Sequence, residues 1–226
     1  MGLVLGIIGG TSLLFADLPP LEKTTVATPY GKAEVYTGAF ALLLRHQYSL
    51  PPHRINYRAC LSALAILGVD RIVAIGSTGS LKPEIPPGSI VIPTDYLSLT
   101  DIPSIYECSI EHVRPELDAD LIRTLGELVP EARVGGVYAQ TRGPRIETVA
   151  EVKGLSKVAD IVGMTVASEA TLALELGMRF AALCTVDNYA NGLGSETLTY
   201  EHILATSRAN AKRTGDILEK IVERLA

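Results

Sequence analysis

The sequence predicts an α/β fold, in which a single domain is built on a twisted, mostly parallel central sheet flanked by helices. Short apolar runs alternate with amphipathic segments along all 226 residues. No linker, low-complexity tract or internal repeat interrupts this alternation. A chain of this length with 47% hydrophobic residues has enough apolar side chains for one substantial core, so we expect one domain over residues 1–226.

The strands are predicted from apolar runs bounded by glycine, proline or polar residues. The first run ends at Gly9-Gly10, and the turn 86–88 (Pro-Pro-Gly) introduces a later one. The predicted strands cover residues 3–8, 35–36, 39–44, 72–75, 89–92, 135–141 and 180–186.

The helices are predicted from apolar residues at helical spacing. Gly68 is a C-cap signal for the first helix, and Pro130 ends the second. The predicted helices cover residues 57–67, 117–128, 147–155, 166–176 and 200–225.

Composition and charge narrow the classes of partner. The net charge is −5 with scattered lysines and arginines, which argues against a nucleic-acid surface. The first ten residues lack a charged signal-peptide region and are too short an apolar run to span a bilayer, so we expect no membrane partner. Cys60, Cys108 and Cys184 lie far apart without a CxxC pair, which favours a reducing, cytoplasmic location and no metal framework. A disulfide remains an alternative if the source is a hyperthermophile.

The segment 184–192 places two amides and an acid directly after a buried strand. Asp187, Asn188 and Asn191 follow the apolar run 181–186, and ligands of open α/β sheets bind at the carboxyl ends of strands. An amide offers both a donor and an acceptor, which suits the edge of an oxidised purine. A turn rich in asparagine and glycine fits these residues equally well.

Two glycine- and hydroxyl-rich segments also follow predicted strands. Residues 9–12 (Gly-Gly-Thr-Ser) and 76–80 (Gly-Ser-Thr-Gly-Ser) each suggest a backbone cradle for an anion, although a plain tight turn explains the first as well. Arg45 and His46 end another strand, where the arginine offers a rigid fork of donors for phosphate. The alternatives are a surface ion pair for Arg45 and a buried, backbone-bonded ring for His46.

Two further segments precede predicted helices. Glu147 follows Gly143-Pro144, and Thr165 follows Gly163-Met164. Taken singly, Glu147 is a favourable charge in a first helical turn and Thr165 is a helix cap. Together with the other strand ends they suggest a site for a phosphate and a heterocycle.

The whole chain resembles the trimeric purine nucleoside phosphorylases, specifically the methylthioadenosine and methylthioinosine phosphorylase branch. The matching segments occur in family order over nearly the full length. They are residues 6–11, 28–31, 45–46, 51–59, 79–82, 143–148, 161–165 and 188–192.

This resemblance implies that phosphate attacks C1′ of the ribose as the bond to purine N9 breaks, through an oxocarbenium-like transition state. Inorganic phosphate is then a co-substrate, and no metal or cofactor is implied. By position, the phosphate-binding residues are Thr11, Arg45, His46 and Thr165, together with the backbone N–H of Ser77.

The resemblance also assigns the base and ribose contacts. Glu147 accepts from N1–H and Asn188 donates to N7 or O6 of a 6-oxopurine, so these two residues join Arg45 and His46 as the expected catalytic group. Ile146 forms an apolar wall beside the base, and Met164 lies against the ribose. A one-residue shift in alignment would present Asp187 instead of Asn188 and favour adenine.

The 5′ pocket matches the start of the last helix. Ile203 and Leu204 favour a 5′-methylthio group, while Tyr200 fits either a methylthio group or a 5′-hydroxyl. The leading hypothesis is therefore phosphorolysis of S-methyl-5′-thioinosine to hypoxanthine and 5-methylthioribose 1-phosphate. The resemblance further implies a homotrimer or a dimer of trimers.

Other functions remain open on the sequence alone. Within the class, the alternatives are 5′-methylthioadenosine phosphorolysis and general inosine or guanosine phosphorolysis. A non-catalytic nucleoside sensor would keep the pocket without turnover. A dinucleotide-binding oxidoreductase is disfavoured because the third glycine of its fingerprint and a suitably placed acid are missing.

Overall fold

A computed structural model describes residues 4–10, 13, 20–194 and 200–226. The strands are β1 (Leu5–Gly9), β2 (Glu22–Thr28), β3 (Gly31–Thr37), β4 (Ala41–Leu44), β5 (Arg71–Ser80), β6 (Ile90–Ile92), β7 (Asp95–Ser98), β8 (Arg133–Val134), β9 (Val137–Gln140), β10 (Ile161–Gly163) and β11 (Arg179–Tyr189). The helices are α1 (Tyr57–Ile66), α2 (Ala119–Leu128), α3 (Val149–Leu155), α4 (Val166–Glu175), α5 (Tyr200–Ala209) and α6 (Ala211–Leu225).

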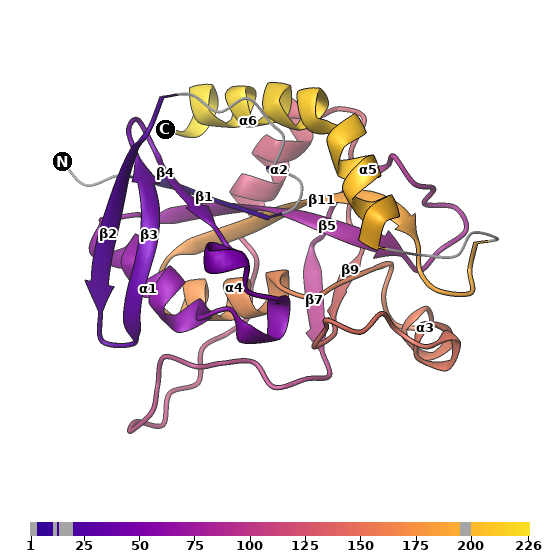
Figure 1. Cartoon of the computed structure of the whole chain (residues 1–226), viewed down its shortest axis with the longest axis horizontal. Helices are drawn as coiled ribbons and strands as arrows, with labels where there is room; N and C mark the ends of the chain where they lie inside the picture. Colours follow the sequence, from indigo (N-terminus) through magenta and orange to yellow (C-terminus); the bar gives the residue numbers. More distant parts are fainter. Residues whose placement is uncertain (1–3, 11–12, 14–19, 195–199) are drawn as a thin grey trace.

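These strands form one mixed sheet whose centre is parallel, which confirms the predicted fold class (Figure 1). β1 pairs in parallel with β4 and β5, and β5 pairs in parallel with β11. Antiparallel pairing is found at the β2–β3–β4 edge and where β10 meets β5. The carboxyl ends of β5 and β11 therefore point the same way, and in Figure 1 they lie at the right, between α5 and α3.

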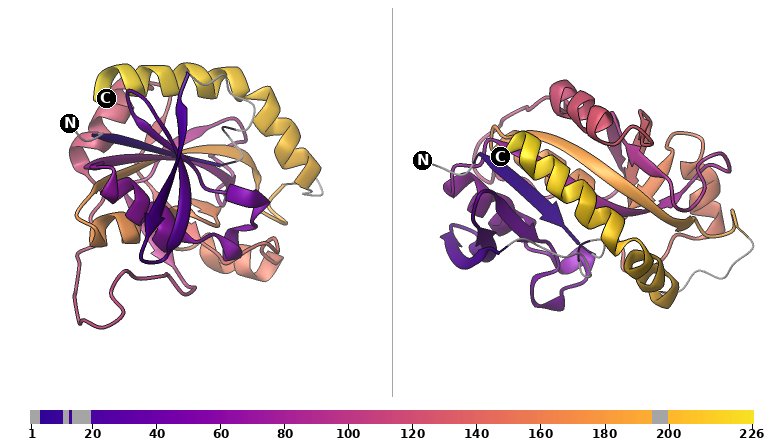
Figure 2. Two further views of the ribbon diagram at one scale, coloured as in Figure 1. Left: turned by 60° about the vertical axis from the view of Figure 1, so that its left-hand side comes forward. Right: turned by 90° about the horizontal axis from the view of Figure 1, so that it is seen from above.

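The helices form two layers on opposite faces of this sheet (Figures 1 and 2). Successive side chains of a strand face opposite ways, and β1 shows this directly. Ile7 packs in the cluster that contains α2 and α6, whereas Ile8 packs in the cluster that contains α1 and α4. Burial on both faces explains why the central strands are continuous apolar runs in the sequence.

The structure corrects several predicted element boundaries. The long C-terminal helix is broken into α5 and α6 at Asn210. The strand predicted at 135–141 is found as β9, shorter at both ends, and Gly135 and Gly136, whose φ angles are 117° and 96°, separate it from the unpredicted β8. The hairpin from β2 to β3 was largely missed because its exposed edge strand is polar and carries no apolar run.

Candidate active site

The two central strands are longer than predicted, which changes the nature of two predicted loops. Residues 76–80 do not form a loop cradle but continue β5, because they pair with β11 as far as Tyr189. Asp187 and Asn188 likewise lie within the last residues of β11, not beyond its end. The register shifts between Val186 and Asn188, so Asp187 occupies a bulge.

One edge of β5 is open at this place. β1 pairs with β5 as far as Ala74, and β10 pairs with it only from Gly79, so no strand among the described residues pairs with 75–78 on that side. The carbonyl of Ile75 faces the gap and accepts a hydrogen bond from Arg45 Nη1 (2.9 Å). Backbone groups alternate between the two edges of a strand, so the N–H of Ser77 faces the same gap. This is the direction required of the predicted phosphate donor.

Arg45 follows β4 and lies in this gap, but most of its donors are already used by the protein. Its Nε and Nη2 donate to the two carboxylate oxygens of Glu169 on α4 at 2.6 and 3.0 Å. Both side chains are buried, with exposed fractions of 3% and 1%. Burial lowers the pKa of Arg45, but the charge and the hydrogen bonds of Glu169, with smaller effects from Tyr57 and Tyr138, together leave the pKa above its ordinary value.

His46 is held next to Arg45 with a defined tautomer. Its Nδ1 lies 2.9 Å from the carbonyl oxygen of Leu50. A carbonyl can only accept, so Nδ1 carries the proton and Nε2 of the neutral ring is an acceptor. Burial lowers the pKa of His46, which favours the neutral ring.

Thr165 precedes α4 and carries a buried hydroxyl that does not cap the helix. It is the N-cap residue, yet its side chain makes no capping hydrogen bond. Instead, Tyr138 Oη accepts from the backbone N–H groups of Thr165 and Val166, and Gln140 Oε1 accepts from that of Ser168. Thr165 is 8% exposed, and no hydrogen-bond partner for its hydroxyl is found within the described part of the chain. A buried hydroxyl without a partner is costly, so it suggests a ligand.

Glu147 lies just before Thr148, the N-cap of α3, and is therefore outside the first turn in which a favourable helix charge would stand. Its buried carboxylate accepts from Thr141 Oγ1 at 2.5 Å. Asn191 Nδ2 donates to its backbone carbonyl at 2.9 Å, which joins the chain after β11 to the start of α3. The structure thus brings Glu147 to the end of β11, as the base-binding hypothesis requires.

Asp187 and Asn188 are neighbours with different surroundings. The Asp187 carboxylate is buried and accepts hydrogen bonds from Ser77 Oγ and from Thr185 Oγ1 (3.0 Å for the latter). Burial raises its pKa, against the lowering effect of these two hydrogen bonds. Asn188 is half-buried and donates from Nδ2 to the Tyr189 carbonyl at 2.8 Å, which leaves its amide oxygen and one N–H available. Asn188 is therefore better placed than Asp187 to bind a purine edge.

The remaining predicted residues are partly placed. Met164 is half-buried and packs on Gly143, where an added Cβ would come within 2.4 Å of its Sδ. Ile146 is half-buried beside Glu147. Thr11 lies outside the described residues, as do the side chains of the three predicted 5′-pocket residues, Tyr200, Ile203 and Leu204.

Sequence reasoning missed several residues that support the site. Glu169 holds Arg45, Tyr138 and Gln140 cap α4, and Thr141 binds Glu147. One signal was available, because Glu169 is an acid in the middle of a run of mostly apolar and small residues, 166–174. The others are polar residues on or beside a short strand, and nothing in the local pattern separates them from ordinary strand residues.

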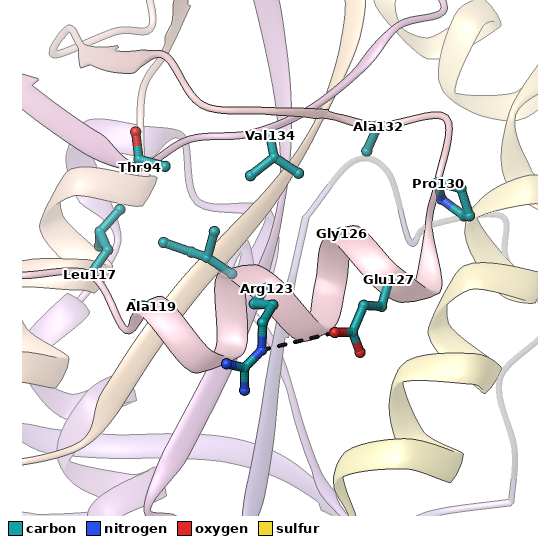
Figure 3. A pocket seen from close by; sticks show the side chains of 10 residues that line it. Thr94, Leu117, Ala119, Arg123, Gly126, Glu127, Pro130, Ala132 and Val134 are labelled. Carbon is teal, nitrogen blue, oxygen red and sulfur yellow. Dashed lines mark ion pairs between the residues drawn. The ribbon is translucent and has the colours of Figure 1, made fainter.

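A pocket of about 570 Å³ lies elsewhere, between α2 and β8 (Figure 3). Its walls are mainly apolar, with Leu117, Ile122 and Val134 among the lining residues. Arg123 and Glu127 on α2 form an ion pair at 3.9 Å at its rim. None of the predicted site residues lines this pocket, so it is separate from the candidate active site.

Comparison with known proteins shows what this chain is similar to. A family model described as "Phosphorylase superfamily" matches residues 4–223. A probable 6-oxopurine nucleoside phosphorylase of Archaeoglobus fulgidus is 40% identical over 235 residues, covering 98% of this chain and 97% of that protein. A probable S-methyl-5′-thioinosine phosphorylase of Methanopyrus kandleri is 36% identical, covering 96% of this chain and 91% of that protein.

Solved structures show the same fold. Methylthioadenosine phosphorylase from Schistosoma mansoni, in complex with adenine, superposes with a TM-score of 0.89. The match covers 98% of this chain and 91% of that one, at 24% sequence identity. At this identity the likeness supports the architecture only.

Proposed function

Because this chain belongs to the phosphorylase superfamily, we propose that it is a purine nucleoside phosphorylase. The reaction is cleavage of the bond between purine N9 and ribose C1′ by inorganic phosphate. Its relatives with 33–40% identity are named as nucleoside phosphorylases of two kinds, for 6-oxopurine nucleosides and for S-methyl-5′-thioinosine.

The observation that carries this proposal is the presence of unused donors at the open edge of β5. The Ser77 N–H faces this edge, and Arg45 lies beside it with N–H groups that no described residue uses. The Thr165 hydroxyl, at the start of α4, has no partner among the described residues, and we infer that it binds the same anion. These are donors for an anion, and His46 Nε2 adds an acceptor for a P–OH group. We infer that Thr11 completes the phosphate site, because it follows β1, the strand beside this gap.

The same arrangement supports catalysis by placement and by charge stabilisation. Phosphate held at the gap is positioned to attack C1′ of a ribose that lies against Met164. As the C–N bond breaks, negative charge develops on the purine. The Asn188 N–H donates to N7 or O6, and Glu147 holds N1–H, so the departing base is stabilised where its charge appears.

We further propose that the preferred substrate is S-methyl-5′-thioinosine. A free amide at Asn188 and a carboxylate at Glu147 match the acceptor and donor edge of hypoxanthine. Two of the relatives, from Methanopyrus kandleri and Methanocaldococcus jannaschii, are named as probable enzymes for this substrate. Ile203 and Leu204 remain the expected wall of the 5′ pocket.

The test is phosphate-dependent release of free base from methylthioinosine, methylthioadenosine and inosine, compared by kcat/KM. We expect methylthioinosine to exceed both others by about tenfold or more, about 1.4 kcal/mol of transition-state preference. Preference for methylthioadenosine would contradict the role of Asn188, and preference for inosine would contradict an apolar 5′ pocket. Release of no base from any of the three would overturn the proposed function itself.

The remaining expectations concern the enzyme as a whole. We propose that it acts in the cytoplasm as a homotrimer, or a dimer of trimers, with phosphate as co-substrate and no metal or cofactor. Undiminished activity after exhaustive treatment with a chelator would support the expectation that no metal is needed. Within the described ranges, no helix has the length and apolar character needed to cross a membrane.

A further inference from the structure

The buried ion pair between Arg45 and Glu169 joins two distant parts of the chain beneath the proposed phosphate site. Glu169 lies in the first turn of α4, and Arg45 follows β4, 124 residues earlier. Glu169 binds the guanidinium through both carboxylate oxygens, a fork geometry that fixes the plane as well as the position of the group.

A count of donors shows what this pairing leaves free. A guanidinium has five N–H groups. Glu169 takes one on Nε and one on Nη2, and the Ile75 carbonyl takes one on Nη1. One N–H on Nη1 and one on Nη2 have no acceptor within the described ranges. Gly10 closes on the same group, because an added Cβ there would come within 2.6 Å of Arg45 Nη1.

We propose that Glu169 is the positioning residue that aims the two remaining N–H groups of Arg45 at the phosphate. This rests on the proposed function, since it assigns a role within the phosphate site of that reaction. Without the carboxylate fork, the guanidinium can rotate about its side chain, and its free donors are no longer held at the open edge of β5 that the Ser77 N–H faces.

Stability alone is a poor explanation for this pair. Removing two charges from water costs about as much as their attraction returns, so buried ion pairs are often no better than apolar packing. Burial raises the thiol pKa of both neighbouring cysteines, Cys60 and Cys184, to about 12, and it also raises the pKa of Glu169 against the lowering effect of Arg45. The bidentate geometry is that of a carboxylate with a guanidinium, so we take the pair as charged. A charged pair kept in such surroundings is better explained by the geometry that it imposes.

The experiment compares Glu169→Gln and Glu169→Asp with Ser168→Ala. The glutamine removes the negative charge and replaces one acceptor oxygen with a donor. The aspartate keeps the charge, but its side chain is one methylene shorter, so the carboxylate lies farther from Arg45. Ser168 is the matched control, because it neighbours Glu169 on α4 and loses a buried hydrogen bond to Gln140 (2.7 Å) without touching Arg45. KM for phosphate and for nucleoside is measured separately, and binding of inorganic phosphate is measured by calorimetry.

We expect Glu169→Gln to raise KM and Kd for phosphate about tenfold or more, about 1.4 kcal/mol, while KM for the nucleoside changes far less. Glu169→Asp should raise both phosphate constants by a smaller factor, and Ser168→Ala should leave them unchanged. If Glu169→Gln does not fold, as judged by circular dichroism, the aspartate variant decides. A folded variant at Glu169 with wild-type phosphate affinity would overturn the inference.

Failure of the positioning role of Glu169 can be distinguished from failure of the proposed function. If the wild type binds phosphate but releases no purine base, the proposed function fails. If the wild type turns over and phosphate affinity does not depend on Glu169, only the positioning role fails. Equal losses in Glu169→Gln and Ser168→Ala would also overturn it, since any disturbance of α4 would then have the same effect.

Discussion

Asn188 and Asp187 differ in what holds them, and this difference decides which of them is available to a substrate. Asp187 is bound by two hydroxyls, whereas Asn188 keeps an amide oxygen and one N–H for a ligand. We expect Asn188→Asp to shift preference from methylthioinosine towards methylthioadenosine, because a carboxylate accepts from a 6-amino group and repels O6. The ratio of the two kcat/KM values should change by about tenfold or more.

The neighbouring acid provides the control for this substitution. Asp187→Asn keeps a polar side chain that can bind Thr185 and Ser77, so we expect the base preference to stay as in the wild type. If Asp187→Asn changes the base preference and Asn188→Asp does not, Asp187 and not Asn188 contacts the base.

His46 should make folding stability depend on pH. Burial lowers its pKa below the ordinary 6.5, with the Leu50 carbonyl acting in the opposite direction. The unfolded chain therefore takes up this proton at a higher pH than the folded protein. Its contribution to stability is present above 6.5 and is lost as the pH falls through 6.5 towards the folded value.

We expect His46→Gln to flatten the fall in the free energy of unfolding between about pH 7 and pH 5, the range in which an ordinary histidine titrates. Urea titrations at several pH values measure this. His112→Gln is the matched control, because that histidine is exposed on the segment between β7 and α2. An equally steep fall in both variants would contradict the assignment to His46.

At the scale of elements, α3 is the short helix that begins beside Glu147. Thr148 Oγ1 accepts from the Glu151 N–H, and Glu151 accepts from the Thr148 N–H, a reciprocal capping box. Arg145 adds an ion pair to Glu151 at 2.9 Å. The cap fixes the residue at which α3 starts, and therefore the position of Glu147 directly before Thr148.

Thr148→Ala should lower the free energy of unfolding by about 1 kcal/mol, the usual cost of losing an N-cap side chain. We also expect a higher KM for the nucleoside, because Glu147 loses its fixed backbone, while KM for phosphate stays constant. Thr148→Ser should preserve both quantities. Ser156→Ala, at the other end of α3, removes only an exposed hydrogen bond to Lys153 and serves as the control. A nucleoside KM unaffected by Thr148→Ala would mean that Glu147 is held by Thr141 and Asn191 alone.

At the scale of the molecule, the long segment between β7 and α2 carries apolar side chains in solvent. Leu99 and Ile110 have exposed fractions of 73% and 89%. Single exposed apolar residues are ordinary on a protein surface, but the family resemblance implies a trimer, whose subunit contact would bury some of them. We therefore expect sedimentation equilibrium to give a native mass three times the 24.1 kDa of one chain, or six times for a dimer of trimers.

Ile110→Asp should weaken this assembly if the segment lies in the subunit contact, because association would bury the new charge. Val158→Asp, at a half-exposed position after α3, is the comparison. A native mass equal to that of one chain would contradict the trimer. A trimer that tolerates Ile110→Asp would place the contact elsewhere.

The fold was predictable wherever the pattern along the chain was strong. The predicted helices at 57–67 and 166–176 match α1 and α4 within one residue at each end, because apolar spacing and Gly68 mark them locally. The polar strand β2 and the two-residue β8 carry no such pattern. The lengths of β5 and β11 were missed because each strand is extended by pairing with the other.

The candidate site was likewise predictable in part. The sequence by itself determined the α/β class, the polar residues near the strand ends and the family resemblance, since all three are carried by residue types in chain order. Only the tertiary structure decided that Glu169 holds Arg45, that Ser77 binds Asp187, and that Asn188 keeps its amide oxygen and one N–H unused by the described residues. The first two contacts join residues 124 and 110 positions apart. Their partners are set by sheet register and by the packing of α4, which no local pattern records.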